Sequence, residues 1–399
     1  MVDTGADSLV AVRIGSVGNR PVAAWAEGLR VHVPASLLDR GGWRRAPGAG
    51  GDLEVPESGP TSVSSEDVVR LRERRAFTDQ RPASARLPFS YQLVPGWARA
   101  LVGSAIGRFN RRHVERWAAF PEWPIDLSAD VLDDLRDAAP AAPPARRTPV
   151  VVTHDIDSPE GLTSLVTSFL PLEEAVGARS TSYVVPCAWP VDHALAGEVV
   201  ARGHEIGVHG YDHSNTTPFA AADERGRRLD GARRFAERYG ATGYRAPSLL
   251  RTRPLLRDLG GRYRYDSSMP TSGGLFPTPN NGCATARPFI VEGIAELPIS
   301  LPRDGILRFL GYTPDEIVRV WTECADLIAR SRGVVVLLTH CERRFSGHPR
   351  MLDAYRQFLG HLRDRPDRFA FSTPTRVLDA ASPRPAGAAS DAGARAGAL

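Results

Sequence analysis

The sequence contains no lysine, so arginine fills all 50 of its Lys and Arg positions. Without a lysine amine the chain cannot form the Schiff base of the usual pyridoxal phosphate enzymes, and it cannot supply the lysine of a phosphate-binding loop. Excess charge of one sign is also absent, because 46 acidic residues leave a formal net charge of +4 over 399 residues. This balance, with no long basic block, argues against a nucleic-acid partner.

Cysteines and long apolar runs are few. The four cysteines lie far apart and form no C-x-x-C pair, which favours free thiols in a reducing compartment over a disulfide framework.

The first residues show no basic segment followed by an apolar one, so we expect a cytoplasmic protein. No segment approaches the ~20 consecutive apolar residues of a transmembrane span. Residues 94–112 form an amphipathic stretch with basic residues at its end, which predicts either peripheral contact with a membrane surface or packing on its own domain.

The composition changes along the chain. An alanine- and proline-rich segment predicts a linker at residues 138–147. Residues 1–137 contain a few strand-like and helix-like stretches, and we expect a smaller N-terminal accessory region of α+β type whose fold the sequence does not define. Across residues 148–378, β-branched runs alternate with helical patterns, which predicts a parallel, helix-wrapped sheet or barrel of the TIM type. Residues 379–399 are small residues and prolines, predicted to be a disordered tail.

Polar residues directly follow the predicted strands of this region. The run VVVTHDID places Asp155 and Asp157 at the end of a strand, and three later strands are followed by His209, Arg245 and His340. In barrels of this kind the carboxyl ends of the strands converge on one mouth, where the active site is built. We therefore expect these five residues to line one site.

Three further acids also follow predicted strands, and each has two interpretations. Asp266 either assists catalysis or caps a turn. Glu296 and Glu342 either contact the substrate, or a basic group on it, or are solvated charges at the barrel rim.

The segment HGYDH places His209 and His213 four residues apart. On a helical turn both imidazoles would share a face and could reach one ion. Two imidazoles and one carboxylate make a three-ligand site with an open coordination position, as a catalytic zinc or similar divalent ion needs to hold water. The alternative is a pair of solvated or hydrogen-bonded histidines in a loop, but the D-x-D strand end on the same sheet favours a metal.

Four motifs, THDID, HGYDH, YRAPSL and LLTH, occur in this order across residues 148–378. Together they resemble the polysaccharide deacetylases of the NodB-homology type, also called carbohydrate esterase family four. The resemblance implies a distorted (β/α) barrel and a divalent metal, often zinc, that helps water remove an N-acetyl group from an amino sugar. Carried over position by position, it implies six roles: Asp155 as general base, Arg245 as its partner, His340 as general acid, and Asp157, His209 and His213 as metal ligands.

The chain departs from the family pattern at several points, two of which concern aspartates. Ile156 separates two aspartates that are commonly adjacent, and the family's aspartate and tryptophan motif has Asp266 as its candidate but no tryptophan. We therefore predict a metal-dependent hydrolase that removes an N-acyl group from an amino sugar or a sugar-containing metabolite. Two alternatives stay open: a hydrolase of the same superfamily acting on another carbon–nitrogen bond in a cyclic amide, ureide or formamide, and a non-catalytic carbohydrate- or metal-binding protein.

Overall fold

A computed structural model describes most of the chain. The described residues are 9–14, 24–40, 44–45, 52–54, 63–78, 80–86, 96–111, 125–137, 147–272 and 282–381. The predicted linker, except for Arg147, and the predicted tail beyond residue 381 lie outside these ranges.

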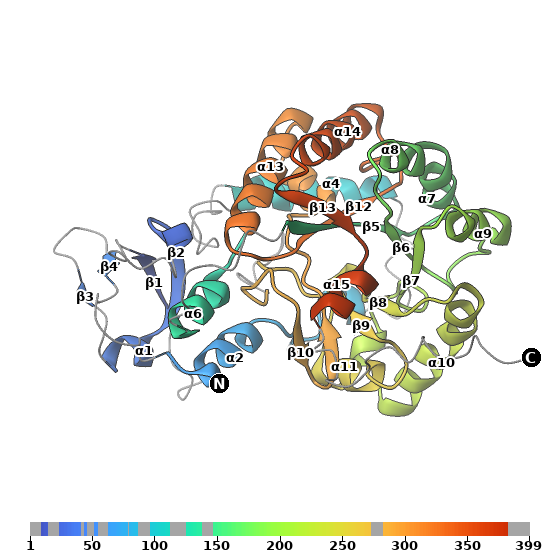
Figure 1. Ribbon diagram of the computed structural model, residues 1–399. Coiled ribbons are helices and arrows are strands. Elements are labelled where there is room, and N and C mark those ends of the chain that lie inside the picture. Colours follow the sequence, from blue (N-terminus) through green and yellow to red (C-terminus); the bar gives the residue numbers. More distant parts are fainter. Residues whose placement is uncertain are drawn as a thin grey trace, which may run out of the picture.

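The larger part of the molecule is a curled nine-stranded sheet wrapped by helices (Figure 1). Its strands follow the order β10-β11-β9-β8-β7-β6-β5-β12, with β13 added to β5. All neighbours are parallel except β10 and β11. The predicted distorted (β/α) barrel is therefore confirmed. Its strands are β5 (Thr148–Ile156), β6 (Thr181–Val184), β7 (Glu205–His209), β8 (Gly243–Arg245), β9 (Tyr265–Asp266), β10 (Phe289–Val291), β11 (Ile294–Glu296), β12 (Val335–His340) and β13 (Phe369–Ser372).

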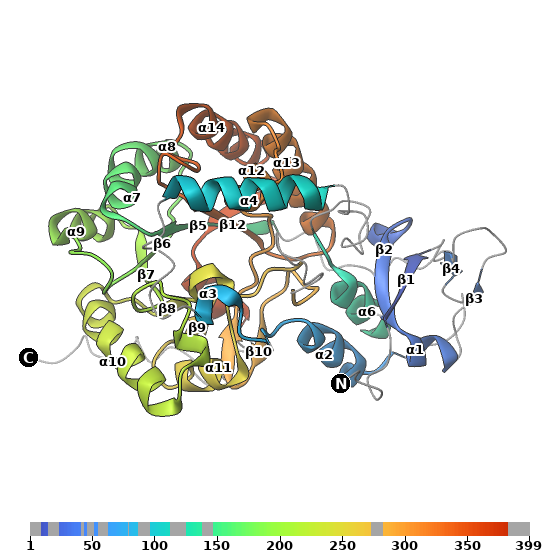
Figure 2. The ribbon, with the colours of Figure 1, turned by 180° about the vertical axis from the view of Figure 1, so that it is seen from behind.

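Helices cover the outside of this sheet (Figures 1 and 2). One of them, α13 (Pro314–Arg330), begins with a capping box in which Thr313 and Glu316 satisfy each other's backbone N–H groups, and it buries an apolar stripe that includes Trp321. The remaining helices of the barrel are α7 (Pro159–Ser164), η3 (Leu165–Phe169), α8 (Leu170–Ala175), α9 (His193–Ala201), η4 (Thr217–Phe219), α10 (Ala222–Tyr239), η5 (Pro247–Leu249), α11 (Arg253–Leu259), α12 (Asp304–Phe309), α14 (Pro349–Arg363) and α15 (Pro374–Ala381).

The two faces of strand β5 have different neighbours, which is why a buried strand can end in the acid Asp155. Val150 and Val152 belong to the apolar layer shared with the helices, whereas Val151 belongs to a second cluster inside the curled sheet. Because side chains alternate along a strand, Thr153 and Asp155 follow Val151 on the inner face. The inner face is thus apolar where the strand begins and polar where it ends, and Asp155 emerges at the mouth.

The two ends of the barrel are covered differently. At the end where the strands begin, Val377 and Leu378 of α15 belong to the same apolar cluster as Val151, and α15 lies across this end in Figure 1. At the opposite end, α3 (Ala83–Arg86) and α4 (Gly96–Arg111) pass in front of the strands in Figure 2. Within the described residues, no helix is both long and apolar enough to span a bilayer.

The N-terminal part contains a small four-stranded sheet of order β2-β1-β4-β3, so the predicted α+β character is confirmed. Buried polar contacts join it to the barrel: Ala286 N–H donates to Asp130 at 3.0 Å, and Arg287 pairs with Asp134 at 2.7 Å. The boundary at residues 138–147 stays a prediction. The elements are β1 (Leu9–Ile14), η1 (Ala24–Ala26), β2 (Arg30–Pro34), α1 (Ala35–Asp39), β3 (Arg44–Arg45), β4 (Asp52–Glu54), α2 (Ser65–Arg74) and α6 (Ser128–Asp137).

Candidate active site

Asp157, His209 and His213 form one cluster at the mouth of the barrel. Their potential ligand atoms all lie within 4.8 Å of one another. The Asp157 Oδ1 atom is 3.5 Å from His209 Nε2 and 3.2 Å from His213 Nε2, and this buried oxygen has no hydrogen-bond partner among the described residues. Such an oxygen is costly to bury unless something else satisfies it. The cluster therefore fits a divalent cation.

The two histidines do not share a helical turn, so that part of the prediction is wrong. His209 ends β7, whereas His213 lies in a loop with φ at 58°. Between them, Gly210 adopts φ of 66° and lies so close to Pro247 that a Cβ would approach the proline ring to 2.5 Å. The chain turns sharply at this glycine, and the turn brings the second imidazole back toward the first.

The protonation of His209 is set by its backbone partner. Its Nδ1 atom lies 3.0 Å from the carbonyl oxygen of Arg245, which can only accept, so Nδ1 carries the proton. Burial lowers the pKa of His209, which keeps the ring neutral. Nε2 therefore presents a lone pair toward Asp157, which is the tautomer a metal ligand requires.

Asp155 stands beside this cluster and is paired with Arg245. The Arg245 Nη1 atom donates to Asp155 Oδ1 at 3.0 Å, and both side chains are buried. Burial raises the pKa of Asp155, but its neighbours, among them the charged Arg245 and His340, outweigh burial and hold the pKa below its ordinary value. Asp155 is therefore ionised, as a proton acceptor must be.

Arg245 is itself held rigidly. Its guanidinium stacks on the ring of Tyr183 at 4.0 Å and donates to Thr153 Oγ1 and to the backbone and hydroxyl oxygens of Ser267 at 2.8–2.9 Å. Because a buried guanidinium is costly unless its donors are satisfied, these contacts fix its position and direct one N–H toward Asp155.

His340 has a partner that the sequence interpretation missed. Its Nδ1 atom lies 2.8 Å from Oδ1 of Asp304, the first residue of α12, and its backbone N–H donates to Oδ2 of the same carboxylate at 2.9 Å. Burial lowers the pKa of His340, but Asp304 outweighs burial and raises it to about 9. Asp304 follows the ELPISLP run, yet nothing in the sequence connects it with a histidine 36 residues away. Asp266, the predicted family aspartate, does not take this position.

Glu342 is neither solvated nor at an open rim. It is buried, and its Oε1 accepts from Asp157 N–H at 3.0 Å and from Ser158 Oγ at 2.9 Å. Burial and the charge of Asp157 raise the pKa of Glu342 to about 7. Gly161 makes room for this carboxylate, since a Cβ there would lie 2.4 Å from Oε1. Glu342 therefore holds the backbone that carries a predicted metal ligand.

Asp266 and Glu296 form a separate buried pair. Ser268 Oγ donates to Asp266 at 2.7 Å, and Met269 N–H donates to Glu296 at 2.9 Å. Burial raises the pKa of both carboxyl groups, and the neighbouring Asp266 raises the pKa of Glu296 further. The solvated interpretation of Glu296 is wrong.

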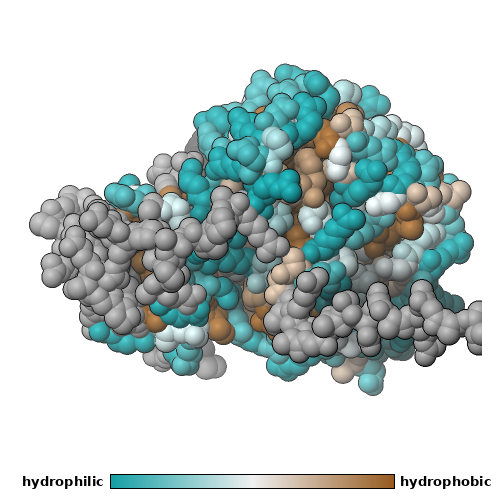
Figure 3. Space-filling view, in the orientation of Figure 1, coloured by the Kyte–Doolittle hydropathy of each residue, from teal (hydrophilic) through white to brown (hydrophobic). Residues whose placement is uncertain are grey.

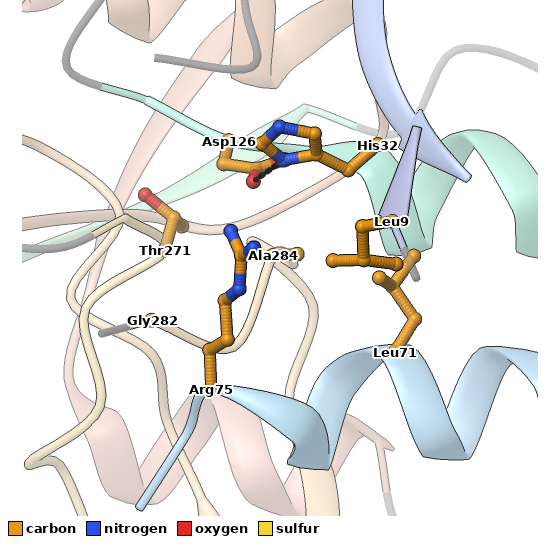
Figure 4. Close-up of a pocket in the computed structure, with 8 residues that line it drawn as sticks. All are labelled: Leu9, His32, Leu71, Arg75, Asp126, Thr271, Gly282 and Ala284. Carbon is orange, nitrogen blue, oxygen red and sulfur yellow. Dashed lines mark ion pairs between the residues drawn. The ribbon is translucent and has the colours of Figure 1, made fainter. Parts of the chain in front are cut away.

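A small cavity lies between the N-terminal sheet and the barrel (Figure 4). His32 and Asp126 lie next to each other at 3.7 Å on one side of it, and Arg75 points into it. Its volume of about 10 Å³ leaves room for about one water molecule. None of the predicted site residues lines it, so it is not a substrate pocket.

No protein-family model and no curated protein matches this sequence. Solved structures do match. A Mycobacterium smegmatis protein described as a polysaccharide deacetylase is 20% identical with a TM-score of 0.47, over 60% of this chain and 92% of that chain. A chitin deacetylase from the fungus Colletotrichum lindemuthianum is 14% identical with a TM-score of 0.40, over 58% and 88%. A CE4 family pseudoenzyme from Bacillus anthracis is 13% identical with a TM-score of 0.40, over 59% and 66%.

These likenesses concern the course of the chain. The family that the four sequence motifs resemble is also the one named in the descriptions of two of these solved structures.

Proposed function

We propose that the protein is a metal-dependent hydrolase that removes an N-acyl group, most simply acetyl, from an amino sugar or a sugar-containing metabolite. One observation carries the proposal: an ionised carboxylate and a protonated imidazole lie at the same barrel mouth as a cluster of three potential metal ligands. A binding protein needs neither a proton acceptor nor a proton donor. The hydrolysis of an amide needs both, because the amine is a poor leaving group until it is protonated.

The metal would be held by Asp157, His209 and His213, and zinc is our first candidate because it accepts this mixture of nitrogen and oxygen ligands. When bound, a divalent cation lowers the pKa of a coordinated water and polarises a carbonyl oxygen. The roles of the remaining residues follow from their own contacts.

Asp155 acts as the general base in this proposal. Its carboxylate is ionised, and Arg245 occupies Oδ1, which leaves Oδ2 to accept a proton. Oδ2 lies 3.6 Å from His209 Nε2, so a water near the cluster is within its reach. Arg245 orients Asp155 and keeps it charged.

His340 acts as the general acid. It enters the reaction protonated, because Asp304 holds its pKa at about 9, and it donates a proton to the amide nitrogen as the carbon–nitrogen bond breaks. The water oxygen and one of its protons leave in the carboxylic acid, the other water proton passes through Asp155 to solvent, His340 regains a proton from solvent, and the amine leaves neutral. The roles of Asp155 and His340 are thus complementary.

The test combines metal analysis of the purified protein with mass-spectrometric detection of acetate or formate released from a panel of N-acylated amino sugars. We expect about one divalent metal per chain. Asp155→Asn should keep the metal and lose turnover by ~10² or more, whereas Asp157→Asn should lose the metal. Exchanged phenotypes would exchange the two roles. Absence of acid release by the metal-loaded wild type, from every compound, would contradict the proposed activity.

A further inference from the structure

Helix α4 carries an exposed apolar surface. Leu101 is 65% exposed, Val102 55% and Phe109 66%, which places them among the most exposed large apolar side chains of the described residues. The three lie on one side of the helix, since positions 101, 102 and 109 recur at helical spacing. Single exposed apolar residues are common, but a group on one helix face usually marks an interaction surface.

The opposite side of α4 is fixed to the barrel. A Cβ at Gly103 would lie 3.0 Å from the Phe309 ring, and one at Gly107 would lie 2.1 Å from the Phe309 carbonyl oxygen, so only glycine allows this approach. The helix therefore cannot turn its apolar side inward without losing this contact with α12.

This surface lies at the catalytic end of the molecule. The Phe309 ring packs against Phe345 at 6.1 Å, and Phe345 packs against His340 at 4.8 Å between ring centroids. Figure 2 shows α4 across the end of the barrel opposite to α15. Helix α4 therefore lies next to the mouth that holds His340.

Arginines lie beside the apolar surface. The segment of residues 96–111 contains three arginines and no acidic residue. Arg108 is exposed on the same side of the helix, seven residues after Leu101, and Arg343 and Arg344 are exposed on the loop that directly follows His340. An apolar strip beside arginines fits the surface of a lipid bilayer, where apolar side chains can contact acyl chains and arginines can contact the phosphates of the headgroups.

We propose that α4 and the Arg343–Arg344 loop dock the protein onto an anionic phospholipid bilayer, with the barrel mouth directed at the headgroups. Leu101, Val102 and Phe109 enter the boundary between headgroups and acyl chains, and the arginines contact the phosphates. The docking does not depend on the proposed hydrolysis, because none of these side chains belongs to the predicted metal or proton-transfer groups.

The test is co-sedimentation of the full-length protein with phosphatidylcholine vesicles that contain or lack phosphatidylglycerol. We expect binding to the anionic vesicles that weakens with salt. Leu101→Ser/Phe109→Ser should lower the partition coefficient at least ~10-fold, and Arg343→Gln/Arg344→Gln should lower it roughly fivefold per arginine on anionic vesicles only. Ile290→Ser is the matched control, because Ile290 is 71% exposed on β10, and it should bind like the wild type.

Three results would overturn the proposal. Wild-type protein could remain in the supernatant with both kinds of vesicle, or the Leu101→Ser/Phe109→Ser variant could bind as well as the wild type. A dimer that this double substitution dissolves, without any vesicle binding by the wild type, would assign the surface to a second copy of the chain. Equal thermal unfolding of the variants establishes that each is folded.

Discussion

Replacement of Asp304 by asparagine tests whether one buried charge keeps the proposed acid protonated. Asparagine preserves the size of the side chain but removes its negative charge. In the wild type the pKa of His340 is raised from 6.5 to about 9. Because one pKa unit corresponds to about 1.4 kcal/mol, this rise represents on the order of 3 kcal/mol in favour of the imidazolium. Asp304 is the largest contributor that acts in this direction.

The direction of the pH effect follows from the sign of this shift. A raised pKa means that the imidazolium, which is the form that can donate, persists as the pH rises and is lost near pH 9. Without the charge of Asp304, the pKa of His340 should fall toward 6.5, because burial then has less to oppose it. The alkaline limb of kcat should move down by about two pH units. At about pH 6 the variant should resemble the wild type, and at about pH 8.5 it should be slower by roughly 10².

The assay is kcat as a function of pH on an N-acylated substrate. Ser346→Ala is the matched control, since Ser346 Oγ donates to Asp304 Oδ2 at 2.7 Å and its loss leaves the charge in place. The control should keep the alkaline limb where it is. A loss of activity in Asp304→Asn that is equal at both pH values, with an unmoved limb, would refute the electrostatic argument and leave Asp304 a purely structural role.

Three further predictions concern other parts of the structure. His340→Ala should lose amide hydrolysis by ~10² or more while retaining metal and most hydrolysis of an activated ester, whose leaving group needs no proton; parallel losses on both substrates would remove it as the acid. Gly161→Ala should destabilise the protein by about 1–3 kcal/mol and weaken metal binding, because the new methyl group displaces Glu342; Gly360→Ala, where a Cβ meets nothing within 4 Å, is the control in thermal unfolding and metal titration. Removal of residues 1–144 should give an insoluble or non-cooperatively unfolding product, since Arg287 then loses its buried carboxylate partners; a soluble, cooperatively folded barrel would contradict this.

The alternation of β-branched strands and helical patterns was enough to predict the barrel, because both signals are local along the chain. The same locality placed Asp155, Asp157, His209, Arg245 and His340 at strand ends, and parallel strands then required them to meet. These residues do converge in the structure, although their chemical roles stay predictions.

Contacts between distant segments were not encoded in any local pattern. The pairing of Asp304 with His340 depends on where α12 begins relative to β12, and the turn that returns His213 to His209 depends on Gly210 packing against Pro247. In the same way, the sequence left Glu342 as either a substrate contact or a solvated rim charge, whereas it lies buried against the backbone of Asp157. The sequence by itself determined which polar groups reach the mouth of the barrel, since strand periodicity is local. Only the tertiary structure decided which groups face one another there, and hence which are ionised, because burial and neighbouring charges that set a pKa come from residues far apart in the chain.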